Sequence, residues 1–482
     1  MTRRRKILLT LAACLGGLVL ALAIAVAIIG RDEASFNDSD LAVHRPDVPD
    51  AENGYSYFLQ AGDIMYWVGS DAWTQAGLHP EIDTTSVDET ESGSETPLGP
   101  GTQLEYMAEG RNWYPTLAAE VLEHNAQTLA LVEKGLACRQ SVAPKMIGMN
   151  FANFPTFNFL RIADILELKS LDLARSGQGE AALDQAVDIV RFGHSVEHAQ
   201  GVIINALVGT TVKQVGLRAV RRQLRDSTLS PDFLKRTAAR LGEWTDSSNA
   251  FANTFCAEYE WSSELYRTMP QNLANAVLSP PGPGAAGSPR PFAFQFGVVY
   301  KPEETCCLAA ETLRTLKDAS IKPFSQTRET VSLLAPQSQP SLLGEVIGGN
   351  IVGRRLHRAV FPALAGILRM KSRIQTESAA TRALVALKAF KAATGRLPQT
   401  LDELMPAYLP AVPLDDFDGQ PIRYSPQKGI VYSVGENLKD DGGMTRDEAR
   451  QWWMAKNFGA VPPEDTTFES WDQPDMSYPI EF

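Results

Sequence analysis

The distribution of apolar positions along the chain predicts three kinds of segment. Residues 7–29 form a run without a single charged side chain. From Leu117 onwards, apolar residues recur at intervals of three and four, the spacing that places them on one face of a helix. Near the C-terminus, two stretches at 421–425 and 430–434 alternate apolar and polar residues, as short strands do. The pattern predicts a mainly α-helical protein with a small α+β region at its end.

The N-terminal apolar run has the length of a membrane anchor. At 1.5 Å per residue, a helix from Ile7 to Ile29 would be about 34 Å long, and a bilayer's hydrocarbon core is about 30 Å thick. Four cationic residues, from Arg3 to Lys6, precede the run, which predicts that residues 1–6 lie in the cytoplasm. We expect a single-pass protein of the bacterial inner membrane, with its bulk extracytoplasmic. A cleaved signal peptide is the alternative, although its apolar region usually has about 7–15 residues.

The helical periodicity predicts a hairpin or bundle domain over 110–278 and a helical continuation over 292–370. The expected helices cover 117–139, 156–176, 180–199, 201–225, 231–247, 248–269, 303–319, 341–370 and 372–394. A segment rich in proline and glycine, 279–291, is expected to link the two helical regions.

Two segments separate the apolar run from the helical domain. Residues 30–78 form a lead-in segment with one short helix predicted from Phe58 to Val68. Residues 79–103 are rich in Thr, Ser, Gly and Pro, carry several carboxylates and contain no basic residue. Such a composition buries too little apolar surface to offset the entropy of ordering, so we expect an acidic disordered loop.

A series of short motifs follows the last predicted helix. In order these are Gly395-Arg-Leu-Pro398, Leu401-Asp-Glu-Leu404, Gly419-Gln-Pro421, Tyr432-Ser-Val-Gly435 and Asp440-Asp-Gly442. With these motifs, residues from about 375 to 445 resemble the globular domain of the major pseudopilin of type II secretion, general secretion pathway protein G. The resemblance implies an α+β domain over 371–445, followed by a tail over 446–482. The rest of the chain resembles uncharacterised bacterial membrane-anchored envelope proteins.

The pseudopilin resemblance also implies a calcium site in the loop after Tyr432-Ser-Val-Gly435. Calcium binds six to eight oxygen ligands from carboxylates and carbonyls. The matching loop offers Glu436, Asp440 and Asp441, with Asn437 where the family often has Asp. A solvated acidic turn without a metal is the alternative for the same residues.

One string in the helical region has the spacing of a zinc site. His194, Glu197 and His198 form an H-x-x-E-H string on a predicted helix, the pattern of inverzincin peptidases. At about 100° per residue the two histidines lie about 40° apart, so all three side chains can address one ion. The other interpretation is that the histidines are packed or solvated at the end of a helix.

The net charge of the chain and its lack of known catalytic and nucleotide-binding motifs limit the classes of function that we expect. The net charge is −12 although four cationic residues lie in the first six, so the acidic body repels phosphate backbones and we expect no nucleic-acid partner. The chain has no nucleophile elbow, no Walker loop and no dinucleotide fingerprint. We expect a binding or scaffolding protein of the cell envelope, with a protein partner, more than an enzyme. The alternative is a zinc metallopeptidase that uses His194, Glu197 and His198.

Overall fold

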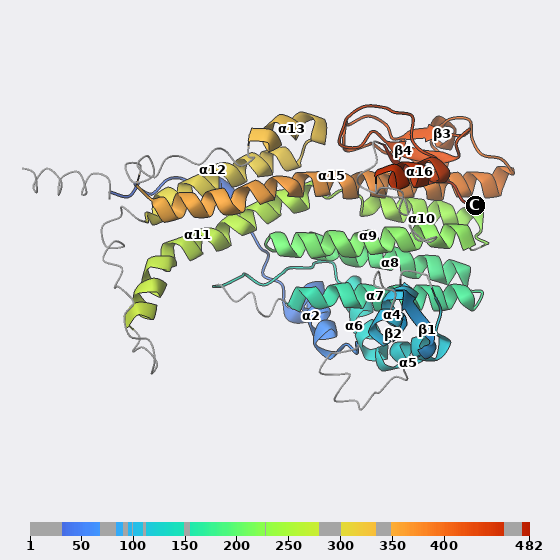
Figure 1. Ribbon diagram of the computed structural model, residues 1–482, viewed down its shortest axis with the longest axis horizontal. Coiled ribbons are helices and arrows are strands. Elements are labelled where there is room, and N and C mark those ends of the chain that lie inside the picture. The colour runs from blue at the N-terminus through green and yellow to red at the C-terminus, as the bar shows by residue number, and fades with distance from the viewer. Residues whose placement is uncertain are drawn as a thin grey trace, which may run out of the picture.

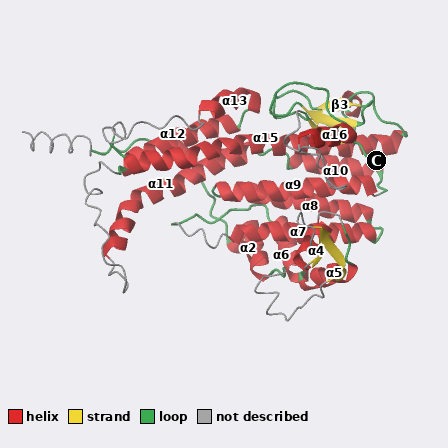
Figure 2. Cartoon of the chain, in the orientation of Figure 1, coloured by secondary structure: helices red, strands yellow, loops and turns green. Residues whose placement is uncertain are grey.

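The structure is a computed structural model that describes residues 31–67, 83–89, 95–98, 100–108, 112–148, 155–226, 228–278, 300–333, 349–456 and 475–482. Helices dominate this part of the chain, and strands are confined to two small sheets (Figure 2). The predicted linker, 279–291, lies outside the described residues.

The N-terminal half contains α2 Gly54–Ile64, β1 Asp83–Glu89, β2 Glu95–Leu98, α4 Pro100–Ala108, α5 Pro115–His124, α6 Ala126–Ala137, α7 Asn158–Arg175, α8 Gly179–Glu197 and α9 Ile203–Asp226. The C-terminal half contains α10 Pro231–Glu243, α11 Ser248–Leu278, α12 Pro302–Ser320, α13 Phe324–Leu333, α15 Ile351–Thr394, β3 Arg423–Ser425, β4 Ile430–Ser433, α16 Arg446–Lys456 and β5 Met476–Pro479. Local signals set several of these bounds. Pro231 in the first turn opens α10, and Gly395, at a φ of 77°, ends α15.

The helices are stacked in layers (Figure 1). Helices α7, α8 and α9 pack against one another, and α15 packs on α9 and α10. One apolar core runs through these layers and into the C-terminal lobe, which we define as residues 395–456 and 475–482; Phe192, Leu384 and Val431 belong to it. A second core joins α11, α12 and the first half of α15, and contains Phe255 and Leu313.

Helix α15 connects the two cores. The sequence predicts two helices here, 341–370 and 372–394, with a domain boundary at 370–371. The structure instead has one helix, Ile351–Thr394, that passes through this boundary. The buried ammonium group of Lys371 donates to Asp416 (2.9 Å) and to the carbonyl of Lys322 (3.0 Å). The C-terminal lobe is therefore fixed to the body along α15.

The sheet of the C-terminal lobe has three antiparallel strands in the order β3-β4-β5. The first two agree with the predicted strands, and Arg423 pairs with Tyr432. The third strand, β5, comes from the segment predicted only as a tail, and Tyr478 pairs with Val431. The described part of the lobe thus includes a strand that lies beyond the region of pseudopilin resemblance.

The predicted acidic disordered loop, 79–103, lies partly outside the described residues. Its described residues form an antiparallel pair, β1 with β2, and the start of α4. β1 contains Thr84, Thr85 and Val87, and such β-branched residues favour extended backbone.

The membrane prediction requires a correction. No helix in the described part of the chain is long and apolar enough to cross a membrane, and the predicted anchor, Ile7 to Ile29, lies outside that part. The longest described helix, α15, carries charged residues such as Arg354 and Glu377 along its length. The fold class is therefore corrected to mainly α-helical with a three-stranded sheet in the C-terminal lobe, and the single-pass inner-membrane localisation is not supported.

Candidate functional site

The H-x-x-E-H string lies where α8 and α9 are in close contact. Two glycines make the contact possible, Gly193 on α8 and Gly209 on α9. A Cβ atom at Gly209 would lie 2.5 Å from the backbone nitrogen of Glu197, so only glycine fits there. This close approach turns Thr210 and Lys213 of α9 toward the end of α8.

Glu197 is enclosed by hydrogen-bond donors. Its residue is 1% exposed, and its carboxylate forms an ion pair with the buried ammonium group of Lys213. Ser247 donates to Oε2 (2.9 Å) and Thr210 donates to Oε1 (3.0 Å). Lys213 also donates to Ser247 (2.9 Å). Both charges are therefore paired and hydrogen-bonded, which is how buried charges are tolerated.

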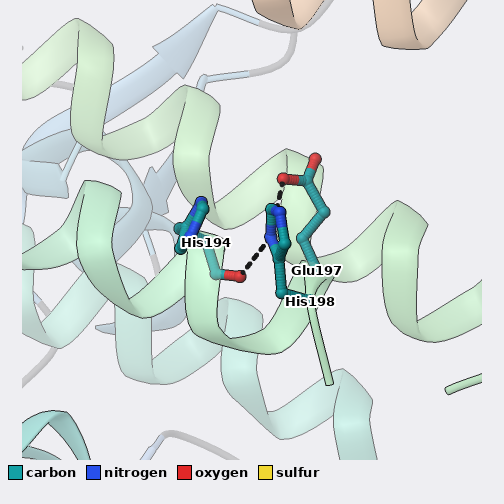
Figure 3. Close-up of side chains that lie close together, drawn as sticks. All are labelled: His194, Glu197 and His198. Carbon is teal, nitrogen blue, oxygen red and sulfur yellow. Dashed lines mark hydrogen bonds and ion pairs between the residues drawn. The ribbon is translucent and has the colours of Figure 1, made fainter. Parts of the chain in front are cut away.

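The two histidines stack beside this ion pair (Figure 3). Their ring centroids are 3.8 Å apart and the rings are inclined by 32°. Nδ1 of His198 lies 3.0 Å from the carbonyl oxygen of His194 and 3.7 Å from Oε2 of Glu197. Nδ1 of His194 is buried and has no hydrogen-bond partner.

Both rings are held neutral. Burial, followed by the positive charge of Lys213, lowers the pKa of His194 to about 2. Burial likewise lowers the pKa of His198, although the carboxylate of Glu197 opposes this shift. Neutral imidazole is the form that binds metals.

The arrangement is nevertheless unlike a peptidase centre. His194, Glu197 and His198 are the one group in the described residues whose ligand atoms lie together, within 4.8 Å of one another. Zinc, however, requires nitrogen atoms that converge at about 2.0–2.1 Å from the ion, whereas these rings lie against each other, tilted by 32°. The carboxylate that would act as the base is neutralised by Lys213. The structure thus brings the three predicted residues together, and Lys213, Thr210 and Ser247 occupy the carboxylate of Glu197.

The predicted calcium ligands are divided by the structure. Glu436 forms an ion pair with Arg373 of α15, and Arg369 lies 3.8 Å away from it. Asp440 accepts a hydrogen bond from the backbone of Gly442 (3.0 Å), and Asp441 accepts one from Asn437 (3.0 Å). Glu436 therefore does not join the two aspartates.

A residue that the sequence did not single out lies beside Asp440 and Asp441. Asp475 precedes β5 and is 1% exposed. Its Oδ2 accepts a hydrogen bond from the backbone of Gly443 (2.7 Å), while its Oδ1 has no partner. Burial, and then the charges of Asp441 and Asp440, raise the pKa of Asp475. No local motif marks Asp475, because it reaches the loop through the pairing of β5 with β4.

A polar pocket of about 350 Å³ lies between α9 and α15. Thr210, Thr211 and Gln214 line it from α9, and Arg369, Arg373 and Ile374 line it from α15. Thr210 also hydrogen-bonds to Glu197, so the pocket adjoins the H-x-x-E-H cluster. Its arginines are the two that face Glu436.

Comparison with known proteins does not extend these observations. No protein-family model matches the chain, and no match was found among curated proteins or among solved structures. The pseudopilin resemblance of residues 375–445 therefore stays a prediction.

Proposed function

We propose that the protein is a non-catalytic binding module whose pocket between α9 and α15 holds a small anionic ligand. The observation that carries the proposal is the convergence of two arginines, two threonines and one glutamine on a hollow of about 350 Å³. Ligand pockets commonly measure about 300–1,000 Å³. Guanidinium groups bind carboxylate or phosphate through paired, charge-assisted hydrogen bonds. The ligand class is thus a small carboxylate or phosphate compound.

A carboxylate of the protein itself supports this ligand class. Glu436 reaches from the C-terminal lobe to Arg373, and Arg369 lies near the same carboxylate. Both arginines therefore already face a negative group, as they would face a ligand. Because Glu436 and the ligand would compete, occupation of the pocket requires that Glu436 gives up part of its contact with the arginines.

The metallopeptidase alternative is less well supported. Its base, Glu197, is bonded to Lys213, Ser247 and Thr210, and both oxygens have donors. A zinc site would need a third ligand, for which α11 offers Glu258, Glu260 and Glu264, and these have partners as well. The backbone of Ile203 donates to Glu258 (3.0 Å). Glu260 pairs with Arg45 (2.5 Å), and Glu264 pairs with Lys145 (3.1 Å). A binding role needs none of these groups to be released.

Titration calorimetry with citrate and with inorganic phosphate tests the proposal. We expect Arg373→Gln and Arg369→Gln each to weaken binding about tenfold or more, because each removes a charge-assisted contact worth about 1.5–3 kcal/mol. Glu436→Gln should bind several-fold more tightly than the unmodified protein, since the internal competitor loses its charge. Arg218→Gln, an exposed change on the same α9 helix, is the matched control and should bind like the unmodified protein.

A hexaglutamate peptide distinguishes a protein partner from a small molecule as the source of the carboxylate. Tighter binding of the peptide than of citrate would assign the pocket to an acidic segment of a protein partner. If neither anion nor the peptide binds at millimolar concentration, even to the Glu436→Gln variant, the proposed function is wrong. The proposed function would also be contradicted if the Arg373→Gln variant bound these anions as tightly as the unmodified protein does.

A further inference from the structure

The two sides of the pocket between α9 and α15 offer different hydrogen-bonding groups. Arg369 and Arg373 line it from α15. They are four positions apart in one helix, which places them on the same helix face. Guanidinium groups carry a fixed positive charge and only donate hydrogen bonds. The α15 side of the pocket therefore suits the anionic group of a ligand.

The threonines on the α9 side have already used their only hydroxyl hydrogen. Thr210 donates to Oε1 of Glu197 (3.0 Å), and Thr211 donates to the carbonyl oxygen of Leu207 (2.9 Å). The direction of both bonds is certain, because an ionised carboxylate and a carbonyl can only accept. Each hydroxyl oxygen keeps lone-pair capacity. Toward a ligand, both threonine hydroxyls can therefore act only as acceptors.

The pocket offers no negative side chain to a second cationic group of the ligand. Within the described part of the chain, no carboxylate lines it. Glu197, which Thr210 contacts, is already paired with Lys213 and accepts from Ser247 (2.9 Å). An ammonium group bound at the threonines would thus lack a counter-charge, in a pocket that two arginines line, and a desolvated charge without a partner is costly. A hydroxyl group donates the same hydrogen bond without this cost.

We propose that the ligand is a hydroxylated anion, whose carboxylate or phosphate binds the two arginines while its hydroxyl group donates to the threonine hydroxyls. This inference rests on the proposed function and specifies the second polar group of the ligand. Met370 and Ile374 also line the pocket from α15, so a short carbon skeleton between the two polar groups has apolar side chains to contact. Hydroxy acids and polyol phosphates share this chemistry.

Titration calorimetry of the full chain with two matched series of ligands tests the proposal. The phosphates are glycerol 3-phosphate, propyl phosphate and 3-aminopropyl phosphate, and the carboxylates are 4-hydroxybutyrate, butyrate and 4-aminobutyrate. Within each series, the members carry a hydroxyl group, no donor or an ammonium group. In at least one series we expect the hydroxylated member to bind about three- to tenfold more tightly than the other two, the usual net effect of one hydrogen bond. The series with the higher affinity identifies the anion as phosphate or carboxylate.

Variants of the threonines test which groups accept the hydrogen bond. Thr211→Val removes an exposed hydroxyl and should reduce the preference for the hydroxylated member, whereas Thr211→Ser keeps the hydroxyl and should retain the preference. Thr210→Val should also reduce it, but this change takes a donor from Glu197, so Thr211→Val decides if the Thr210 variant does not fold. Thr315→Val is the matched control, because Thr315 is an exposed threonine of α12 that donates to the carbonyl oxygen of Glu311 (2.8 Å). It should keep the full preference.

Failure of this inference differs from failure of the proposed function. If inorganic phosphate and all members of both series fail to bind, the proposed function itself is wrong. The hydroxylated ligand class alone is wrong if anions bind through Arg373 but neither series prefers its hydroxylated member, or if an amine binds more tightly. A preference that is undiminished in every folded threonine-to-valine variant of the pocket would also overturn it.

Discussion

At the scale of single residues, the Lys213–Glu197 ion pair shows how the interior of this protein accommodates two opposite charges. The pair is buried, and Thr210 and Ser247 satisfy the carboxylate oxygens while Ser247 also accepts from Lys213. A buried ion pair adds little net stability, but breaking it by removal of one partner typically costs about 3–5 kcal/mol. We therefore regard the H-x-x-E-H string as part of a structural network that joins α8, α9 and the start of α11.

The stability of the protein should depend on pH through His194. The folded protein keeps His194 neutral, with its pKa lowered to about 2, whereas an unfolded histidine binds a proton below about pH 6.5. Between these values the unfolded state binds more protons, so stability falls as pH decreases. His194→Gln should reduce the loss of unfolding free energy between pH 7 and pH 5 by about 2 kcal/mol, at about 1.4 kcal/mol per pH unit.

Urea denaturation at several pH values measures this effect. His44→Gln is the control, because His44 is exposed and its removal should leave the pH dependence unchanged. If the free energy of unfolding changes equally with pH in the His194→Gln variant and in the unmodified protein, His194 is not held neutral by burial.

At the scale of elements, the contact between α8 and α9 depends on glycine. The missing side chains at Gly193 and Gly209 let the two backbones approach, and the approach brings Lys213 within reach of Glu197. The same geometry places Thr210 between the ion pair and the pocket. One close helix contact thus determines the position of both candidate sites.

Gly209→Ala should destabilise the protein by about 1–3 kcal/mol, the usual cost of overpacking. The new Cβ atom would meet the backbone of Glu197, which has no freedom to rotate away. Gly366→Ala, in the middle of α15, is the matched control because a Cβ atom there meets nothing within 4 Å. This control should be neutral or slightly stabilising, since alanine favours helices over glycine. Chemical denaturation measures both variants. If Gly209→Ala lowers the free energy of unfolding less than Gly366→Ala does, the close contact between α8 and α9 is refuted.

At the scale of the whole molecule, two apolar cores share the helices α9 and α15. The larger core extends from α2 to the C-terminal lobe, and the smaller joins α11, α12 and the first half of α15. The C-terminal lobe belongs to the larger core, because Phe417 and Val431 pack with residues of α15 such as Leu384. We therefore expect the lobe to unfold together with the body, while the smaller core can open separately.

Truncation of one buried leucine in each core tests this division. Leu313→Ala should accelerate hydrogen exchange in α11 and α12 and leave α7 and α8 largely protected, because a cavity of this kind costs about 2–5 kcal/mol locally. Leu168→Ala, equally buried in the larger core, should accelerate hydrogen exchange in α7 and α8 and leave α11 and α12 largely protected. Uniform acceleration by both variants would mean that the protein unfolds as one unit.

The sequence by itself determined the features that depend on local spacing. Apolar residues three and four apart placed most helices of the body near their observed positions, as for α8 and α10, because helix periodicity requires no knowledge of the partner surface. The alternating stretches gave β3 and β4, and the H-x-x-E-H spacing gave the cluster of His194, Glu197 and His198.

Only the tertiary structure decided what each charged side chain meets. Lys213 neutralises the base that the sequence offered to zinc, Arg373 pairs with Glu436 of the predicted calcium loop, and the backbone of Gly443 in that loop donates to Asp475, which precedes a strand that the sequence did not predict. These pairs join residues that are 16, 63 and 32 positions apart. No local period relates such positions, since their contact arises only when apolar faces from distant segments pack into one core and bring the charged groups on those segments together.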